Sequence, residues 1–550
     1  MVPYLHRPRA IPWKRFPPRI SHSLIFSLFK AAARLQELKK MPNYAVSVVQ
    51  LVAQLEGPHD APIRHAAAIN FKNTIRYGWD PEKHQDAQEN IDLSEGINIS
   101  ETDRQAIKQN LVQLMCTTPD NVQKQLSEAI SLIAESDYPY KWMDLMPTLA
   151  RQFESPDMNA VTGALGTADS VCMRFRYVAR SDQLYAVIQH TLETIAQPLT
   201  VLMTKLGNAV SQPTVQQNKA QLTAYMEQIR LVCSIFYSLN YQDLPEFFED
   251  NMATWVTELQ KYLQPGIFGI LEVADEEENP SPLDKVQEQI LDIFRLYADK
   301  DEEDFVNNFL AKLVSLVFDR LMATTMLRKH DGLATRSIRF FSSLLVRAAY
   351  VPMFQTEGTL PNMVERIILP NLQLREMEIE NFEDQPKEFM LTEIEGSDSE
   401  SRRAAVQDLL RSMCRFLEKE TVEICTRHIH SLLQRFSANP NDNWAAKDVA
   451  VRVDTFSLLS FCASFAHCFA SVLLDSPLYQ YRHSPRKHAG RRRDQSFGGC
   501  PGFLCEPDSS RVAGYEPPAT DCQGGSYQVC VDFPKAIHAR TLRSALAVLD

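Results

Sequence analysis

The chain has 550 residues, of which 45% are hydrophobic and 23% are charged. This length exceeds what one ordinary hydrophobic core organises, so we expect several domains or an array of repeats. The formal net charge of -12 disfavours a general nucleic-acid-binding protein and suits partners with basic surfaces. Glycine occurs only 18 times, which argues against glycine-rich phosphate loops. The 11 irregularly spaced cysteines indicate reduced, intracellular thiols.

The first 30 residues form an atypical N-terminal segment. Residues 1–36 contain seven Lys and Arg and no acidic residue, as mitochondrial transit peptides do. Five prolines within residues 1–18 oppose that interpretation, because they would break an amphipathic targeting helix. We expect residues 1–22 to be irregular and a first helix to begin at Ser23.

The stretch Pro62–Trp79 predicts an amphipathic helix with Pro62 in its first turn. An apolar residue at every fourth position forms one ridge: Ile63, Ala67, Phe71, Ile75 and Trp79. A parallel ridge is mostly basic: Arg64, Ala68, Lys72 and Arg76. One such helix cannot bury its apolar ridge alone, so the pattern predicts stacked neighbours on both sides. The basic ridge is expected to be solvated.

Similar patterns predict helices along most of the chain. We expect them at 23–40, 43–55, 100–116, 119–135, 141–153, 157–177, 181–207, 215–239, 244–263, 281–299, 302–326, 333–351, 362–375, 401–419 and 422–436. The helix starts near Asp120 and Asp157 lie 37 residues apart, and that interval holds two helices. This period matches HEAT-type helical hairpins. The predicted fold is therefore an all-α solenoid, with residues 31–155 and 156–451 as its two parts.

Three acidic stretches interrupt the helical pattern: 275–278, 301–304 and 376–400. Acidic residues at a helix start commonly complement the helix dipole, which is our interpretation of the two short runs. The third run holds ten carboxylates and only Lys387 as a basic residue, so it is too long for a cap. It is either a solvated, mobile insertion or a docking surface for a basic partner.

The character of the chain changes after about Val451, and residues 452–550 are expected to be disordered or irregular. Thr455–Leu474 contains no Asp, Glu, Lys or Arg and is long enough for a membrane span, although its serines and His467 oppose that interpretation. The region 476–528 is rich in Pro, Gly, Ser and Arg. The only cysteine cluster lacks the paired spacing of a zinc site: Cys500, Cys505, Cys522 and Cys530.

Motifs of catalysis are missing from the sequence, and we expect neither an enzyme nor a cofactor. There is no GxxxxGK[ST], HExxH or GxSxG motif. His428 and His430 lie two apart on a predicted helix, so they cannot share a face and are expected to be surface residues. A solenoid instead offers an extended binding surface. Lys72 and Asn73 could line it, or Asn73 could bridge neighbouring repeats.

Four stretches make a family resemblance specific. IRHAAAINFKNTIRYGW (63–79) and NVQKQLSEAISLIAESDYPYKWMDLMP (121–147) resemble the N-terminal domain of importin-β-type nuclear transport receptors. FYSLNYQDLPEFFEDNMATW (236–255) and IEGSDSESRRAAVQDLLR (394–411) resemble, within that superfamily, the exportins of importin-α. The resemblance covers roughly residues 31–451 and stops abruptly after Val451.

The resemblance implies a receptor that binds the small GTPase Ran in its GTP form together with importin-α. It also implies passage through nuclear pore components, between nucleus and cytoplasm. Carried over residue by residue, it places Ran contacts on the helices near 62–78, 103–116 and 121–135 and on the acidic insertion. The candidate Ran-binding residues are Lys72, Asn73, Glu376, Glu378, Glu380, Glu383, Asp384, Glu395 and Asp398.

Because family members continue well beyond the position of Val451, we expect this chain to be truncated. Three hypotheses follow from the sequence. The first is an export receptor for importin-α. The second is a truncated HEAT-repeat scaffold without productive Ran-dependent export. The third is a scaffold anchored to a membrane through 455–474.

Overall fold

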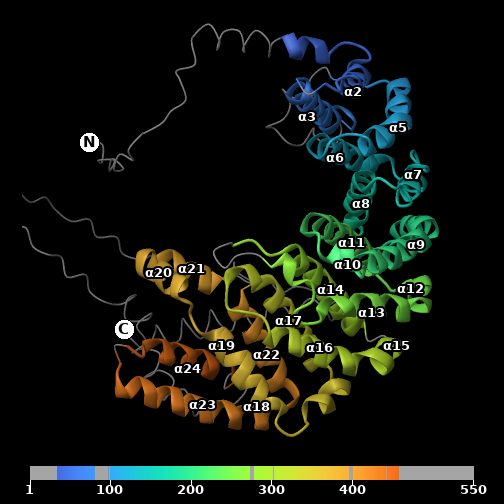
Figure 1. The fold of residues 1–550 in the computed structure, drawn as a ribbon. Helices are drawn as coiled ribbons and strands as arrows, with labels where there is room; N and C mark the ends of the chain where they lie inside the picture. The colour runs from blue at the N-terminus through green and yellow to red at the C-terminus, as the bar shows by residue number, and fades with distance from the viewer. Residues whose placement is uncertain are drawn as a thin grey trace, which may run out of the picture. The chain divides into compact units, whose positions relative to one another are not determined.

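The computed structural model describes residues 34–57, 59–80, 97, 99–272, 278–300, 303–395, 401–440 and 442–457. All of them belong to one structural unit, Met1–Ser484. This described part is built of helices and turns without a strand, which confirms the predicted all-α solenoid (Figure 1).

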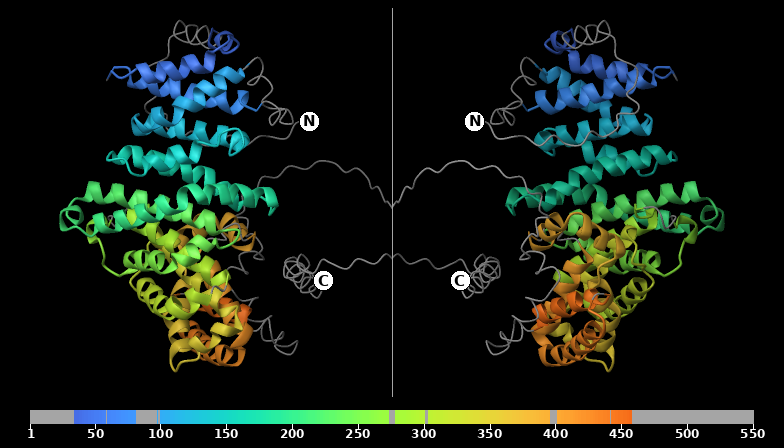
Figure 2. Two further views of the ribbon diagram at one scale, coloured as in Figure 1. Left: turned by 90° about the vertical axis from the view of Figure 1, so that its right-hand side faces the viewer. Right: turned by 90° about the vertical axis from the view of Figure 1, so that its left-hand side faces the viewer.

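The helices stack in two rows that follow the chain (Figure 1). The first row contains α3 (Ala61–Gly78), α6 (Asp120–Asp137), α8 (Met158–Met173), α11 (Lys219–Asn240), α14 (Pro282–Lys300), α17 (Asp331–Leu345) and α22 (Arg402–Phe416). The second row contains α2 (Tyr44–Gln54), α5 (Glu101–Cys116), α7 (Leu145–Gln152), α9 (Asp182–Val210) and α13 (Met252–Gln260). Each helix packs against the next in its row, and Figure 2 shows this as successive layers of helices.

The remaining helices connect or flank these rows. They are α10 (Pro213–Gln216), α12 (Glu246–Asp250), α15 (Glu303–Phe305), α16 (Ala311–Met322), α18 (Thr359–Met363), α19 (Leu369–Leu372), α20 (Glu376–Asp384), α21 (Pro386–Glu395), α23 (Glu418–Ala438) and α24 (Trp444–Ser457).

Two predicted single helices are interrupted by π-helical turns. The helix expected at 302–326 is divided into α15, Val306–Leu310 and α16. The helix expected at 362–375 is divided into α18, Val364–Ile368 and α19. For the second interruption Pro370 gives a reason, because it cannot donate a hydrogen bond to the carbonyl group of Arg366.

Helix α3 buries most of the apolar ridge that the sequence predicts. Phe71 and Ile75 are fully buried, and Trp79 is 3% exposed. Ile63, in contrast, is 56% exposed, because it lies in the first turn of α3. The guanidinium of Arg104 on α5 stacks on the Trp79 ring at 4.7 Å from its centroid, which ties the two rows together.

The cations of the basic ridge of α3 are paired, so the expected solvation is wrong for Lys72, which is 15% exposed, whereas Arg76 remains 38% exposed. Arg64 donates a hydrogen bond to the carbonyl oxygen of Val52 at 2.8 Å. Lys72 and Arg76 both form ion pairs with Glu128 on α6, and Lys72 Nζ lies 3.3 Å from its carboxylate. Lys72 and Arg76 therefore connect neighbouring helices of the first row, whereas Arg64 connects α3 with α2 of the second row.

The stretch 236–255 forms an aromatic core between the rows. The rings of Phe236 and Trp255 lie 4.1 Å apart, and those of Phe236 and Phe248 lie 4.6 Å apart. All three side chains are at most 1% exposed. The indole N–H of Trp255 donates to the hydroxyl of Thr200 on α9 at 3.2 Å, so the buried donor is satisfied.

Several segments with sequence predictions lie outside the described residues. These are residues 1–33, most of the acidic run 275–278, Asp301, Glu302 and everything after Ser457. Only the first three residues of Thr455–Leu474 belong to a described helix, α24. Among the helices that the structure describes, none combines the length and apolar character needed to cross a bilayer.

We expect Phe236→Ala to lower the free energy of unfolding by about 3–5 kcal/mol, because it opens a cavity in the aromatic core. Tyr177→Ala is the matched aromatic control, since Tyr177 is 80% exposed. Its change should stay within about 0.5 kcal/mol. Urea titration followed by circular dichroism measures both variants, and equal losses would contradict the assignment of Phe236 to the core.

Candidate protein-interaction site

The described part of the predicted acidic insertion forms two short helices, α20 and α21, which we call the acidic hairpin (376–395). The two helices pack against each other, and the rings of Phe382 and Phe389 meet at 5.7 Å. Four predicted site residues are exposed on α20: Glu376, Glu380, Glu383 and Asp384. The side chain of Glu395 and the whole of Asp398 lie outside the described residues.

Glu378, the remaining predicted site residue of α20, has a structural role at the start of the hairpin. Its carboxylate accepts from the backbone N–H of Arg375 at 2.8 Å and pairs with the Arg375 guanidinium at 2.7 Å. Burial acts to raise the pKa of Glu378, but these hydrogen bonds outweigh it and hold the pKa below its ordinary value. Glu378 is therefore engaged within the hairpin.

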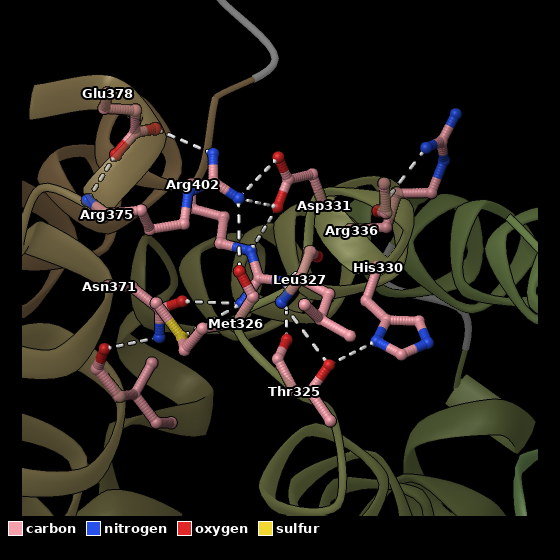
Figure 3. A network of polar contacts seen from close by, with 12 residues as sticks. Thr325, Met326, Leu327, His330, Asp331, Arg336, Asn371, Arg375, Glu378 and Arg402 are labelled. Atoms are coloured by element: carbon pink, nitrogen blue, oxygen red, sulfur yellow. Dashed lines mark hydrogen bonds and ion pairs between the residues drawn. The ribbon is translucent and has the colours of Figure 1, made fainter. Parts of the chain in front are cut away.

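The base of the hairpin is an ionic network centred on Asp331, the first residue of α17 (Figure 3). Nη1 of Arg375 lies 2.8 and 3.0 Å from the two carboxylate oxygens of Asp331. Nε of Arg402, at the start of α22, lies 2.7 Å from the same carboxylate. Arg402 also donates to the carbonyl of Thr325 at 2.8 Å and to the side-chain oxygen of Asn371 at 3.3 Å.

A cleft of about 510 Å³ lies beside this network. Its walls come from the hairpin, from the start of α22 and from the segment that precedes α17. The lining residues are Met326, Arg328, Asp331, Asn371, Gln373, Arg375, Met377, Glu378, Asn381, Asp384, Gln385, Glu388, Phe389, Ser401, Arg402 and Arg403. With four arginines facing carboxylates and amides, the cleft is suited to polar contacts.

The other two predicted site residues lie on α3, which packs against α2 and α6. Lys72 is 15% exposed and is occupied by Glu128, whereas Asn73 is half-buried. Asn70 on the same helix accepts a hydrogen bond from the Tyr44 hydroxyl of α2 at 2.7 Å, and the bridging role of Asn73 stays a prediction. The predicted site thus consists of two separate patches, one on α3 and one on α20.

The sequence analysis missed the residues that hold the hairpin. Arg375 lies 44 positions after Asp331, and Arg402 lies 71 positions after it. No local sequence pattern joins residues that are so far apart. One signal was present: the pair Arg402-Arg403 follows the acidic run, with only Ser401 between them. Arg403 is also used structurally, because it forms a buried ion pair with Asp448 on α24 at 2.7 Å.

The histidines and cysteines singled out in the sequence do not form a metal site in the part of the chain that the structure describes. Within the described residues, no group of three or more His, Cys, Asp or Glu side chains could hold a metal ion. His428 is 25% exposed and lies 3.5 Å from the Glu365 carboxylate, and His430 is exposed. The cysteine cluster at 500–530 lies outside the described residues.

Two family models match the chain. An importin-β N-terminal domain matches residues 31–117, and the Cse1 model matches residues 171–462. The chain belongs to the Cse1 family. This confirms the predicted membership of the importin-β superfamily, and the Cse1 match includes the aromatic core, the acidic hairpin and the Asp331 network.

Curated relatives agree with the Cse1 assignment. Exportin-2 of Danio rerio is 36% identical over 421 residues, and Exportin-2 of Homo sapiens is 35% identical over the same length. Each alignment covers 76% of this chain but 42% of the relative. The chain therefore spans less than half the length of the curated relatives it matches.

A solved structure gives the same assignment. The structure described as the exportin Cse1 in its cargo-free, cytoplasmic state is similar with a TM-score of 0.69 and 30% identity, covering 81% of this chain and 46% of that chain. Lph2, a bidirectional nuclear transport receptor of S. cerevisiae, has a TM-score of 0.55 and 14% identity, covering 79% and 44%. The second likeness shows the fold alone.

The paired carboxylate of Glu378 predicts a pH-dependent loss in the variant Glu378→Gln. Because the pKa of Glu378 in the folded protein lies below the ordinary value of 4.5, its ionised form stabilises the fold above that pH. This contribution disappears as the pH falls through the folded-state pKa. We expect E378Q to melt at a lower temperature than the wild type at pH 7 and at the same temperature in acid.

Glu376→Gln is the control, because Glu376 is exposed in the first turn of the same helix. Differential scanning calorimetry between pH 3 and 7 measures all three proteins. A difference between E378Q and wild type that stays constant over this range would contradict the role of the ionised carboxylate.

Proposed function

We propose that this protein is a nuclear export receptor that binds Ran in its GTP form and importin-α cooperatively and returns importin-α to the cytoplasm. Membership of the Cse1 family, shared with relatives named Exportin-2, carries this proposal. The role needs no cofactor and no catalysis by this chain. It places the protein in both nucleus and cytoplasm, in contact with nuclear pore components.

The acidic hairpin supports a docking role toward a basic partner surface. Glu380, Glu383 and Asp384 are exposed at the end of α20, away from the paired Glu378 at its start. Exposed charges of one sign accelerate encounter with an oppositely charged partner and fix its orientation. The formal net charge of -12 has the same sign as these carboxylates and adds a long-range attraction for a basic partner.

The α3 patch is the second proposed Ran contact. Lys72 and Arg76 share the Glu128 carboxylate, so a partner carboxylate would have to compete with that residue. Asn73, half-buried beside them, offers both a donor and an acceptor. If Ran contacts both patches at once, it fixes the position of one patch relative to the other. Importin-α that binds the solenoid in this same conformation would then bind cooperatively with Ran.

Capture of Ran by the purified chain tests the proposed function. We expect binding to Ran loaded with a non-hydrolysable GTP analogue, none to Ran loaded with GDP, and stronger capture of importin-α when the GTP form is present. Isothermal titration calorimetry measures the three affinities. Nucleotide-independent binding of importin-α alone would favour the scaffold that acts without Ran.

The triple variant E380Q/E383Q/D384N tests the acidic hairpin. Exposed charge pairs contribute about 0.5 kcal/mol each, so we expect affinity for GTP-loaded Ran to fall about tenfold at low salt. The difference from wild type should shrink as ionic strength rises. The control E246Q/E249Q/D250N removes the same number of charges from exposed positions on α12. Equal losses in both variants would contradict a specific contact with the hairpin.

A further inference from the structure

Helix α20 of the acidic hairpin has little buried surface that could fix its position on the repeats. No residue of α20 is buried. Helices of 9 and 10 residues are marginal in water by themselves. A ring contact between Phe382 and Trp444 on α24, with centroids 6.4 Å apart, joins the hairpin to the neighbouring repeat. Polar contacts at the base of the hairpin therefore contribute to its anchorage.

The chain segments on either side of the hairpin meet at one carboxylate. The chain leaves the repeats at Arg375 and returns at Arg402, and both guanidinium groups contact Asp331 within 3.0 Å (Figure 3). We propose that Asp331 is a positioning residue, which holds the hairpin through the residues that flank it and so sets where its exposed carboxylates meet the GTPase. This inference rests on the proposed function, and Asp331 itself need not touch the partner.

The charge of Asp331 is what the clamp requires. Arg402 has a side chain that is 5% exposed, and its other hydrogen-bond acceptors are uncharged groups, among them the Thr325 carbonyl and the Asn371 amide. A buried guanidinium left with neutral acceptors is unfavourable, so the return point of the hairpin would shift toward water.

The second ion pair of Arg375 cannot replace the clamp. Its partner Glu378 belongs to α20, so their 2.7 Å contact moves with the hairpin and does not tie it to α17. Asp331 thus links the hairpin to the first row, and it does so from the N-terminus of a helix that packs on both α14 and α22.

Asp331→Asn tests the clamp with a nearly isosteric side chain. We expect faster amide hydrogen exchange in 376–395, with exchange in α11 and α14 unchanged, and about tenfold weaker binding of GTP-loaded Ran. The localised change in exchange separates a positioning role from general destabilisation. Hydrogen exchange with mass spectrometry and calorimetric titration give the two measurements.

Asp292→Asn is the matched control. Asp292 on α14 pairs with Arg336 on α17 at 3.0 Å and is 27% exposed, against 26% for Asp331, but it does not touch the hairpin. It should leave both measurements at wild-type values. Unchanged exchange at 376–395 in D331N, or an equal change in D292N, would overturn the clamp. If the unsubstituted chain does not bind Ran, the proposed function fails, whereas binding that D331N leaves unaltered would refute the positioning role alone.

Discussion

Burial of each first-row helix between its two neighbours is the constraint on which the rest of the structure depends. The ridge of α3 shows the principle: Phe71 and Ile75 have no exposed surface once the adjacent helices are in place. In such an array, the total stability is approximately the sum of the stabilities of the single repeats and of the interfaces between neighbours. A defect in one repeat therefore destabilises mainly the two repeats that flank it. The aromatic cluster around Phe236, Phe248 and Trp255 extends this burial from the first row to the second.

Directional polar bonds fix the relative position of neighbouring repeats, because apolar burial alone allows them to slide against each other. The carbonyl oxygen of Gln242, which follows α11, accepts from both Arg180 at 2.7 Å and Lys300 at 2.9 Å. Lys108 and Asp137 form an ion pair at 2.5 Å with both side chains at most 5% exposed. Breaking such a pair on one side leaves a buried charge, so these contacts oppose slippage between layers. Helix α20 differs because it has no buried residue and is held at its start by ion pairs.

Most of the helical architecture could be predicted because its signals are local. Ser100 caps α5 by accepting from the Asp103 backbone N–H at 3.2 Å, as the spacing of those residues indicates. The apolar ridge of α3 could be predicted because apolar residues recur at every fourth position within that one helix. The network at the hairpin could not be predicted, because Asp331, Arg375 and Arg402 come from three different segments. Likewise, the partner of Lys72 is Glu128, 56 positions away, so the basic ridge was expected to be solvated.

The meeting of Arg375 and Arg402 at one carboxylate also bears on how the hairpin varies in evolution. A segment whose two ends lie side by side resembles an inserted module, which a chain can gain, lengthen or exchange without displacing what flanks it. The repeats on either side keep their own contacts, since α17 packs directly on α22 across the point of insertion. Selection can therefore act on the length and charge of this module while the stack remains a constant framework.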